Sequence, residues 1–314
     1  MKFRLFSIFV VGLFFLLAWQ HQAISDWWFL RNYEPSEEIS SLASDSYMSE
    51  HGERLFYLAD PRINDKEEFN ENCPIIEKSF VLGCYASGRI YILSVDQEAL
   101  DGVMEVTAAH EMLHKAYDRL SESERAEIVD ELEDFYATIE NETLRDLIDR
   151  YEERGGVSVR QNELHSILPT QVVDMPPQLE EYYDRYFTDR ESVARMYESY
   201  EAVFIEIQER IEELRGELSS LRSDISVMEQ ELVATSDLIT NLNQELERRE
   251  DEGDIEGYNE LVPEQNQAVA RYNSLLDRHR SAINTHNRLV DDLNDIVLYH
   301  TDLVNSLDSS FQSM

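Results

Sequence analysis

The chain has 314 residues, of which 42% are hydrophobic, a composition typical of a folded protein with room for a compact domain and an elongated part. Acidic residues outnumber basic ones by 65 to 27, which gives a formal net charge of −38. Because such a surface repels nucleic-acid phosphates and anionic lipid headgroups, the composition excludes nucleic-acid binding and polybasic docking onto membranes.

The N-terminal segment, residues 1–25, is expected to be a membrane anchor. Residues 5–18 contain no charge, and the apolar stretch of about 17 residues is at the short end of what spans a bilayer. Lys2 and Arg4 precede it, so the positive-inside rule leaves the N-terminus in the cytoplasm and the rest of the chain outside. A cleaved signal peptide is the alternative, and it exports the chain as well. We therefore expect a membrane-anchored, single-pass protein with an extracytoplasmic body.

Strand signals follow a polar, Ser-rich segment over residues 26–50, which we interpret as a juxtamembrane stalk. Two β-rich runs, Ser79–Leu82 and Arg89–Leu93, predict a hairpin that ends just before a long helix. The second run is either an internal strand or an edge strand that could pair with an extended peptide. Cys73 and Cys84 flank the first run, and in an oxidising compartment they are expected to form a disulfide, with two free thiols as the alternative.

A series of helices is predicted after these strands. Ser121 and Glu124 form a capping-box pattern that opens one helix, and Asn141 can cap the next, which is stopped by Gly155 and Gly156. Strands followed by a cluster of helices predict a small α+β domain over residues 51–188.

The last part of the chain, residues 189–314, predicts a coiled-coil helical hairpin. From Phe204 to Leu246 apolar residues recur in alternating steps of three and four, interrupted only at Thr235, and a second series runs from Val262 to Leu307. The Gly-containing break at 250–257 separates arms of about 60–70 Å each, which favours an antiparallel pair. The alternative is that both helices pair with another chain. Three histidines on the second arm occupy core-like positions, where polar residues set register more often than they bind metal: His279, His286 and His300.

The motif that carries chemistry is HEMLH, residues 110–114, inside a helical apolar pattern. The spacing of four places the imidazoles of His110 and His114 on one helix face, where they can share a metal ion. Glu111 is displaced by about 100° around the helix axis, so it can reach a metal-activated water without being forced to bind the metal. This is the machinery of a zinc-dependent hydrolase acting on amide bonds. Two histidines on a helix face, one packed and one exposed, are the alternative.

A catalytic zinc needs a third protein ligand, and the downstream helical segment around NELHS supplies the candidate Glu163. His165 is two residues away and points nearly opposite on a helix, so only one of the two can face the metal. Asp118 reaches the metal badly and is better placed to orient His114. Asp174 is the remaining acidic candidate.

HEMLH together with a downstream helical glutamate resembles the gluzincin branch of zinc metallopeptidases. The resemblance implies that His110, His114 and Glu163 bind Zn²⁺ and that Glu111 is the general base. It covers roughly residues 75–190. Ser166 and Ile167 stand where many gluzincins have an aspartate, and no motif marks the group that stabilises the oxyanion, for which residue type and nearness suggest only tyrosines: Tyr182, Tyr183 and Tyr186.

The expected fold class is therefore α+β, with a small zincin-like domain, a long antiparallel coiled-coil hairpin and one N-terminal transmembrane helix. The expected function is extracytoplasmic, zinc-dependent hydrolysis of peptide bonds. The expected partners are a peptide or protein at the outer membrane face, the membrane through the N-terminal helix, and another protein or a second copy through the coiled coil. A non-catalytic envelope scaffold with a zinc-binding head and a cell-wall hydrolase are the alternatives.

Overall fold

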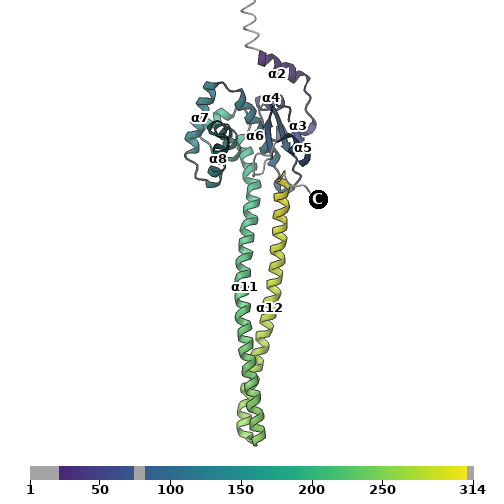
Figure 1. Cartoon of the computed structure of the whole chain (residues 1–314), viewed down its shortest axis with the longest axis vertical. Coiled ribbons are helices and arrows are strands. Elements are labelled where there is room, and N and C mark those ends of the chain that lie inside the picture. The colour runs from purple at the N-terminus through teal and green to yellow at the C-terminus, as the bar shows by residue number, and fades with distance from the viewer. Residues whose placement is uncertain (1–20, 74–81, 310–314) are drawn as a thin grey trace, which may run out of the picture. The chain divides into compact units, whose positions relative to one another are not determined.

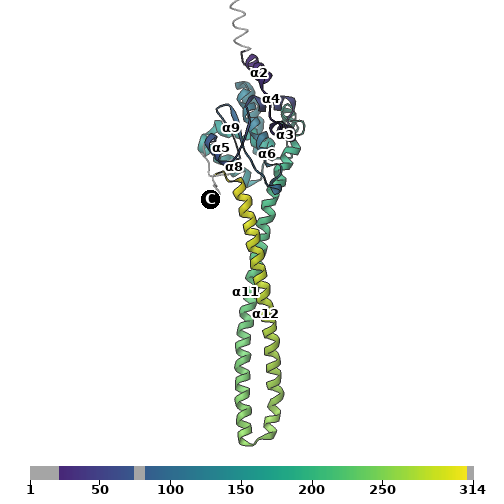
Figure 2. The same cartoon turned by 90° about the vertical axis from the view of Figure 1, so that its right-hand side faces the viewer.

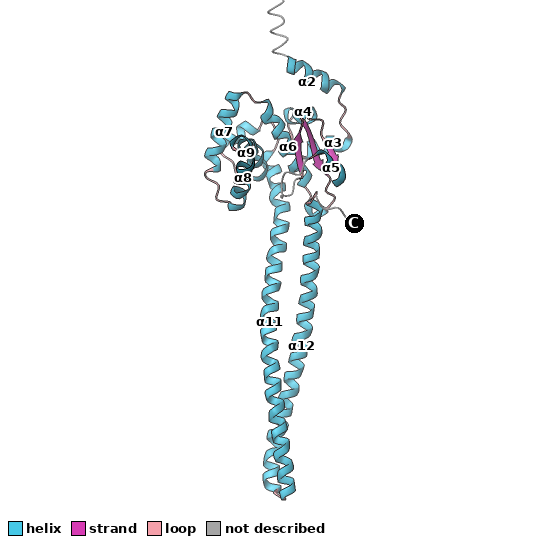
Figure 3. Cartoon of the chain, viewed as in Figure 1, coloured by secondary structure: helices cyan, strands magenta, loops and turns pink. Residues whose placement is uncertain are grey.

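The computed structural model describes residues 21–73 and 82–309, and 80% of these residues are helical (Figure 3). They divide into two compact units. The head comprises the chain up to Val203 together with the segment from Leu303 onward. The hairpin comprises Phe204–Asp302.

Three short strands form the only sheet in the described residues, in the order β1-β3-β2. β1 (Arg62–Asn64) is parallel to β3 (Arg89–Leu93), and β2 (Gly83–Ala86) is antiparallel to it. The predicted strand Arg89–Leu93 is confirmed, but because it is paired on both sides it is internal, and β1 and β2 are the two outer strands. Most of the other predicted strand, Ser79–Leu82, lies outside the described residues.

Four helices precede or interleave with this sheet: α2 (His21–Asn32), α3 (Glu37–Asp45), α4 (Glu50–Leu58) and α5 (Lys66–Asn72). Short polar side chains cap the last three, because the side chains of Ser36, Ser49 and Asp65 each accept a hydrogen bond from a backbone amide of the first turn. Ile39 and Leu42 of α3 are buried in the head core, so the polar segment before residue 50 contributes to packing.

The remaining helices of the head include the HEMLH helix, with α7 and α8 to one side of it (Figure 1). After a 3₁₀ turn at Glu98–Leu100 come α6 (Val103–Arg119), α7 (Glu122–Tyr136), α8 (Glu142–Gly155), α9 (Val157–Gln171) and α10 (Pro177–Tyr183). The predicted capping box of Ser121 and Glu124 is confirmed, as is the Asn141 cap. α6 packs against α3, α4, the sheet and α9, so its centre is covered on several sides.

The disulfide Cys73–Cys84 is present, as predicted. It joins the end of α5 to β2, beside a small cluster in which Phe69 and Leu93 are buried. Closing this loop restricts the unfolded chain, which stabilises a thin sheet by about 2–3 kcal/mol.

The hairpin is formed by α11 (Arg190–Glu252) and α12 (Ile255–Leu307), whose arms are joined by a tight turn (Figure 2). Gly253 in that turn has a φ of 74°, a backbone conformation that glycine adopts without strain. Contacts across the arms, such as the hydrogen bond from Gln265 to Asn243, show that the two helices are antiparallel partners. The intramolecular hairpin is therefore confirmed.

The seam of the second arm differs in detail from the predicted apolar series. Ala268, Leu275 and Leu289 are buried there, whereas Ile283 and Val297 of the predicted series are exposed. A regular heptad alternation through the buried positions also includes His279, His286 and His300. The buried positions between the two arms therefore include small and polar residues, which a pattern based on large apolar side chains does not detect.

The predicted fold class is wrong. The sheet has only three short strands, and the polar segment before residue 50 is largely helical, so the described chain is mainly α with a small sheet. The prediction of a single-pass, membrane-anchored protein is also contradicted, because none of the described helices is long and apolar enough to cross a membrane. Residues 1–20, which carried that prediction, lie outside the described residues.

Candidate metal centre

The two histidines of HEMLH lie on one face of α6, as their spacing predicts. α6 begins after Gly102, whose φ of 89° turns the chain into the helix, and its apolar residues are buried in the head core. The Nε2 atoms of His110 and His114 are 3.1 Å apart, and the two rings are nearly perpendicular. The Nε2 atoms of the two rings therefore face one common point.

The carboxylate of Glu163 on α9 faces the same point from the opposite side. One carboxylate oxygen lies 3.6 Å from His110 Nε2, and the other lies 3.7 Å from His114 Nε2. Helices α6 and α9 pack directly against each other, so a residue some fifty positions along the chain is brought beside the imidazoles. The structure thus brings together all three residues expected to bind metal.

The separations of these atoms fit a zinc ion. Ligand atoms arranged tetrahedrally at about 2.0–2.1 Å from Zn²⁺ are about 3.3–3.4 Å from one another, and the observed 3.1, 3.6 and 3.7 Å bracket that value. In the described part of the chain, the only set of three or more His, Cys, Asp or Glu side chains whose ligand atoms lie within 4.8 Å of one another is His110, Glu111 and His114. The histidines and carboxylates match the donor set that zinc takes in catalytic sites.

The electrostatics favour a cation at the same point. Burial alone would raise the pKa of Glu163, but the neighbouring His114 and His110 outweigh it and hold that pKa below its ordinary value. One oxygen of Glu163 and one of Glu111 are buried without a hydrogen-bond partner among the described residues. An unpaired buried carboxylate oxygen is costly, and a divalent ion would remove that cost for both groups.

Glu111 lies under the outer strand of the sheet. Its side chain is 4% exposed, and burial raises its pKa to about 7. A Cβ atom added at Gly83 of β2 would lie 2.7 Å from a carboxylate oxygen of Glu111 and 2.5 Å from a methyl carbon of Thr107. Only glycine permits this close approach of strand and helix, and as a result Glu111 is shielded from bulk water.

Glu163 owes its position to a helix that contains a proline. Pro169 lies inside α9 and has no N–H, so the carbonyl of His165 one turn earlier has no backbone donor. The hydroxyl of Tyr183 donates to that carbonyl at 2.9 Å and replaces the missing amide. Both groups are buried, so an unmade hydrogen bond here would carry the full cost of desolvation.

Arg190, which the sequence analysis did not single out, fixes the end of the same helix. Its guanidinium is 4% exposed and donates to the carbonyls of Pro169 and Val172 at 2.9 and 2.7 Å. It also forms a two-pronged pair with the carboxylate of Glu180 on α10. A single arginine thus ties the last turn of α9 to α10 and to the first turn of α11.

The other predicted candidates lie elsewhere. His165 is fully buried, and its Nε2 is 3.0 Å from the Tyr182 hydroxyl. Asp118 interacts with the Tyr85 hydroxyl, and His114 Nδ1 has no hydrogen-bond partner in the described chain, so the prediction that Asp118 orients His114 is wrong. Asp174 lines a different cavity, beside α7 and α10.

The three tyrosines considered for the oxyanion have other partners. Tyr183 is fully buried against the His165 carbonyl. Tyr182 and Tyr186 pack edge-on against each other, the guanidinium of Arg185 lies over both rings, and Tyr182 also contacts the His165 ring. Their roles in the described structure are those of packed aromatic side chains.

No protein-family model, curated protein sequence or solved structure matches this chain. The resemblance to gluzincins therefore rests on the two motifs alone.

Proposed function

We propose that the head is a zinc-dependent peptidase. The observation that carries this proposal is the convergence of two imidazole nitrogens and one carboxylate from two packed helices, with a second, buried carboxylate one residue from the first histidine. His110, His114 and Glu163 would hold the zinc ion. Zinc bound there would supply a Lewis acid that makes water a stronger nucleophile at neutral pH and polarises a carbonyl.

Glu111 has the properties of a general base. Its carboxylate is buried, has one oxygen without a hydrogen-bond partner among the described residues, and has a pKa raised to about 7 by burial. A base of that strength takes a proton from the attacking water at neutral pH and returns it to the leaving amine. Its place beside Gly83 keeps bulk water from solvating the carboxylate.

The outer strand suggests how an extended peptide would bind. β2 is paired with one strand only among the described residues, so one row of its backbone groups can accept a further strand. Because Gly83 of β2 packs on Glu111, a peptide added to this edge would run past the general base. A peptide in extended conformation is therefore the substrate that the site fits best.

The test compares three head variants with a surface control. Glu111→Gln is expected to keep the zinc content and to lose peptidase activity by about a thousandfold, since a positioned base contributes about 10²–10⁴ in rate. His110→Ala and Glu163→Ala are expected to lose zinc and activity together. Glu122→Gln, an exposed change on α7, should alter neither.

Metal content would be measured by mass spectrometry of the purified chain, and activity with a library of quenched fluorescent peptides. Cleavage by Glu111→Gln at the wild-type rate would exclude its role as the base. No cleavage of any peptide by the zinc-loaded wild type would exclude the enzyme and favour a scaffold with a zinc-binding head.

A further inference from the structure

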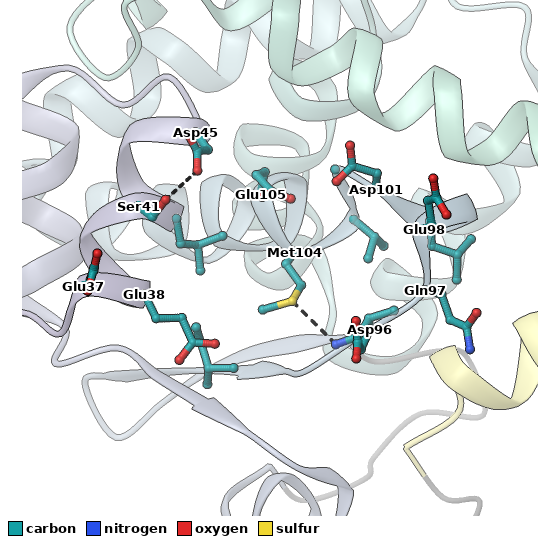
Figure 4. Close-up of a pocket in the computed structure, with 16 residues that line it drawn as sticks. Glu37, Glu38, Ser41, Asp45, Asp96, Gln97, Glu98, Asp101, Met104 and Glu105 are labelled. Atoms are coloured by element: carbon teal, nitrogen blue, oxygen red, sulfur yellow. Dashed lines mark hydrogen bonds between the residues drawn. The ribbon is translucent and has the colours of Figure 1, made fainter.

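A second cavity of the head lies away from the metal centre. Its volume is about 640 Å³, and it is formed by α3, the end of β1, the segment that follows β3 and the first turn of α6. Its apolar surface comes from these residues: Leu42, Ile63, Val95, Leu100, Val103 and Met104. Figure 4 shows Met104 at the centre of the cavity, with its sulfur accepting a hydrogen bond from the Val95 amide. The volume is in the range of pockets that bind small ligands or short peptide segments.

All the charged residues that line this cavity are acidic. Glu37, Glu38 and Asp45 line it from α3 (Figure 4). Four further carboxylates line it from the opposite side, namely those of Asp96, Glu98, Asp101 and Glu105. No lysine, arginine or histidine is among the described residues that line the cavity, and none of the seven carboxylates forms an ion pair with a described residue. Among the described residues, no cationic side chain therefore neutralises the rim.

The arrangement of the carboxylates indicates an extended cation rather than a compact one. A metal ion needs several oxygens to converge on one point. Nowhere in the described chain outside the HEMLH helix do three or more such side chains bring ligand atoms within 4.8 Å of one another. Carboxylates spread around an apolar floor instead match a chain that alternates basic and apolar side chains. Burial, together with the charges of Asp101 and Asp45, raises the pKa of Glu105, as expected for an acid without a cationic partner.

We propose that this acidic cavity binds a basic, partly apolar peptide segment, and that it thereby recruits the substrate of the peptidase. Recruitment of the substrate rests on the proposed function, whereas binding of the peptide does not. The connection between the two sites is α6. Glu105 lines the cavity and His110 belongs to the metal centre, and the two are five positions apart, which corresponds to about 7.5 Å along the helix axis and about 140° around it. A peptide held in the cavity would therefore have to pass around α6 to reach the metal centre, which takes more extended residues than the axial distance alone.

Binding would be measured by fluorescence anisotropy with the full chain carrying Glu111→Gln, so that the probe is not cleaved. The probe is a labelled peptide of alternating arginine and leucine, and its two companions carry glutamate for arginine or serine for leucine. The cavity variant is Glu98→Gln, Asp101→Asn and Glu105→Gln together. The matched control changes the charge by the same amount at exposed positions on α7: Glu122→Gln, Glu127→Gln and Asp130→Asn.

The cavity variant is expected to raise the Kd of the arginine–leucine probe about tenfold, and the control variant to leave it nearly unchanged, because the charges of the control lie outside the cavity. The glutamate companion should not bind, and the serine companion should bind more weakly than the probe. Equal weakening by both triple variants would overturn the proposal, since it would show attraction by net charge alone. If the serine companion binds as tightly as the probe, the cavity recognises a simple polycation and the proposal is overturned. If the chain binds no peptide but binds Ca²⁺, and only the cavity variant loses that binding, the cavity is a metal site and the proposal is likewise overturned.

A second measurement separates this proposal from the proposed function. With Glu111 restored, the cavity variant should raise KM for a basic peptide and leave kcat for a short neutral peptide unchanged. Cleavage of both peptides with unaltered KM would refute recruitment and leave the peptidase intact. Binding that depends on the cavity in a chain that cleaves nothing would refute the peptidase and leave the binding site intact.

Discussion

The head and the hairpin use their charged residues in opposite ways. In the hairpin, arginines and glutamates pair on the outside of the helices at spacings of three and four, as Arg248 does with Glu245 and Glu252. In the head, some charged side chains are instead buried between elements, as are Arg190, which pairs with the partly exposed Glu180, and Glu163 beside the two histidines. Exposed pairs are solvated and contribute little, whereas buried ones are costly to break. The head should therefore be sensitive to single polar changes to which the hairpin is indifferent.

Metal removal should separate the two units most strongly. A ligand that binds the folded state at a thousand times its Kd stabilises it by about 4 kcal/mol. We expect a zinc chelator to lower the stability of the head by about that amount, because His110, His114 and Glu163 would be left as an uncompensated polar cluster. The hairpin holds no such cluster in its described residues. Hydrogen exchange followed by mass spectrometry of the full chain would measure protection in α6 and α9 separately from that in α11 and α12.

Chelation of the Glu163→Ala variant is the control, since a chain that cannot hold zinc should show no further loss. Equal loss of protection in both units would contradict the comparison, and no loss in either would contradict the metal centre.

Arg190 should show the next largest effect. Replacing it with alanine leaves the carbonyls of Pro169 and Val172 without their donor and Glu180 without its partner, which we expect to cost about 3 kcal/mol. Arg195, on the same helix, is 59% exposed and pairs with Glu191 one turn away, so Arg195→Ala is a matched control with little expected effect. Urea unfolding of the two variants would measure the difference. Equal losses would show that burial does not decide the value of these arginines.

The sequence predicted the parts of this molecule that depend on local pattern. HEMLH placed its two imidazoles on one helix face because i and i+4 are neighbours on any α-helix. Cys73 and Cys84 formed the expected disulfide, and the caps at Ser121 and Asn141 followed from their own side chains. Each of these requires only a few consecutive turns of chain.

What the sequence did not predict depends on packing between distant elements. Arg190 carries no motif, and its role follows from carbonyls that face it only in the folded head. The expected share of β structure before the HEMLH helix was too large, because α4 and α5, with nine and seven residues, each offer only about two turns of helical pattern. In the hairpin, Ala268 rather than a large side chain fills the seam, since close approach of two arms requires small residues at some positions.

Tyr183 tests how far the position of Glu163 depends on one buried hydrogen bond. Tyr183→Phe removes the donor to the His165 carbonyl, and we expect a loss of about 1–2 kcal/mol in stability together with weaker zinc binding. Pro169→Ala restores a backbone N–H to the same carbonyl, so Tyr183→Phe should cost less in that background. Thermal unfolding and zinc titration of the four proteins in this cycle would measure the coupling. Additive losses would show that the hydroxyl does not replace the proline's missing donor.

The smallest effect is expected for Glu245 in the hairpin, although its pKa is strongly shifted. Hydrogen bonds from Arg248, followed by those from Arg249, lower the pKa of this carboxyl from 4.5 to about 2. Because the folded pKa lies below the unfolded one, the stabilisation is complete above pH 4.5 and is lost as the pH falls towards 2. The group is exposed, so 1 M salt should move the pKa back towards its ordinary value. Carboxyl NMR titration, with Glu245→Gln to assign the signal and Arg248→Gln to remove the first donor, would measure this. If salt leaves the pKa of Glu245 unchanged, this surface pair is shielded from solvent in the same way as the buried charged groups of the head. The difference between exposed pairs in the hairpin and buried ones in the head would then not hold.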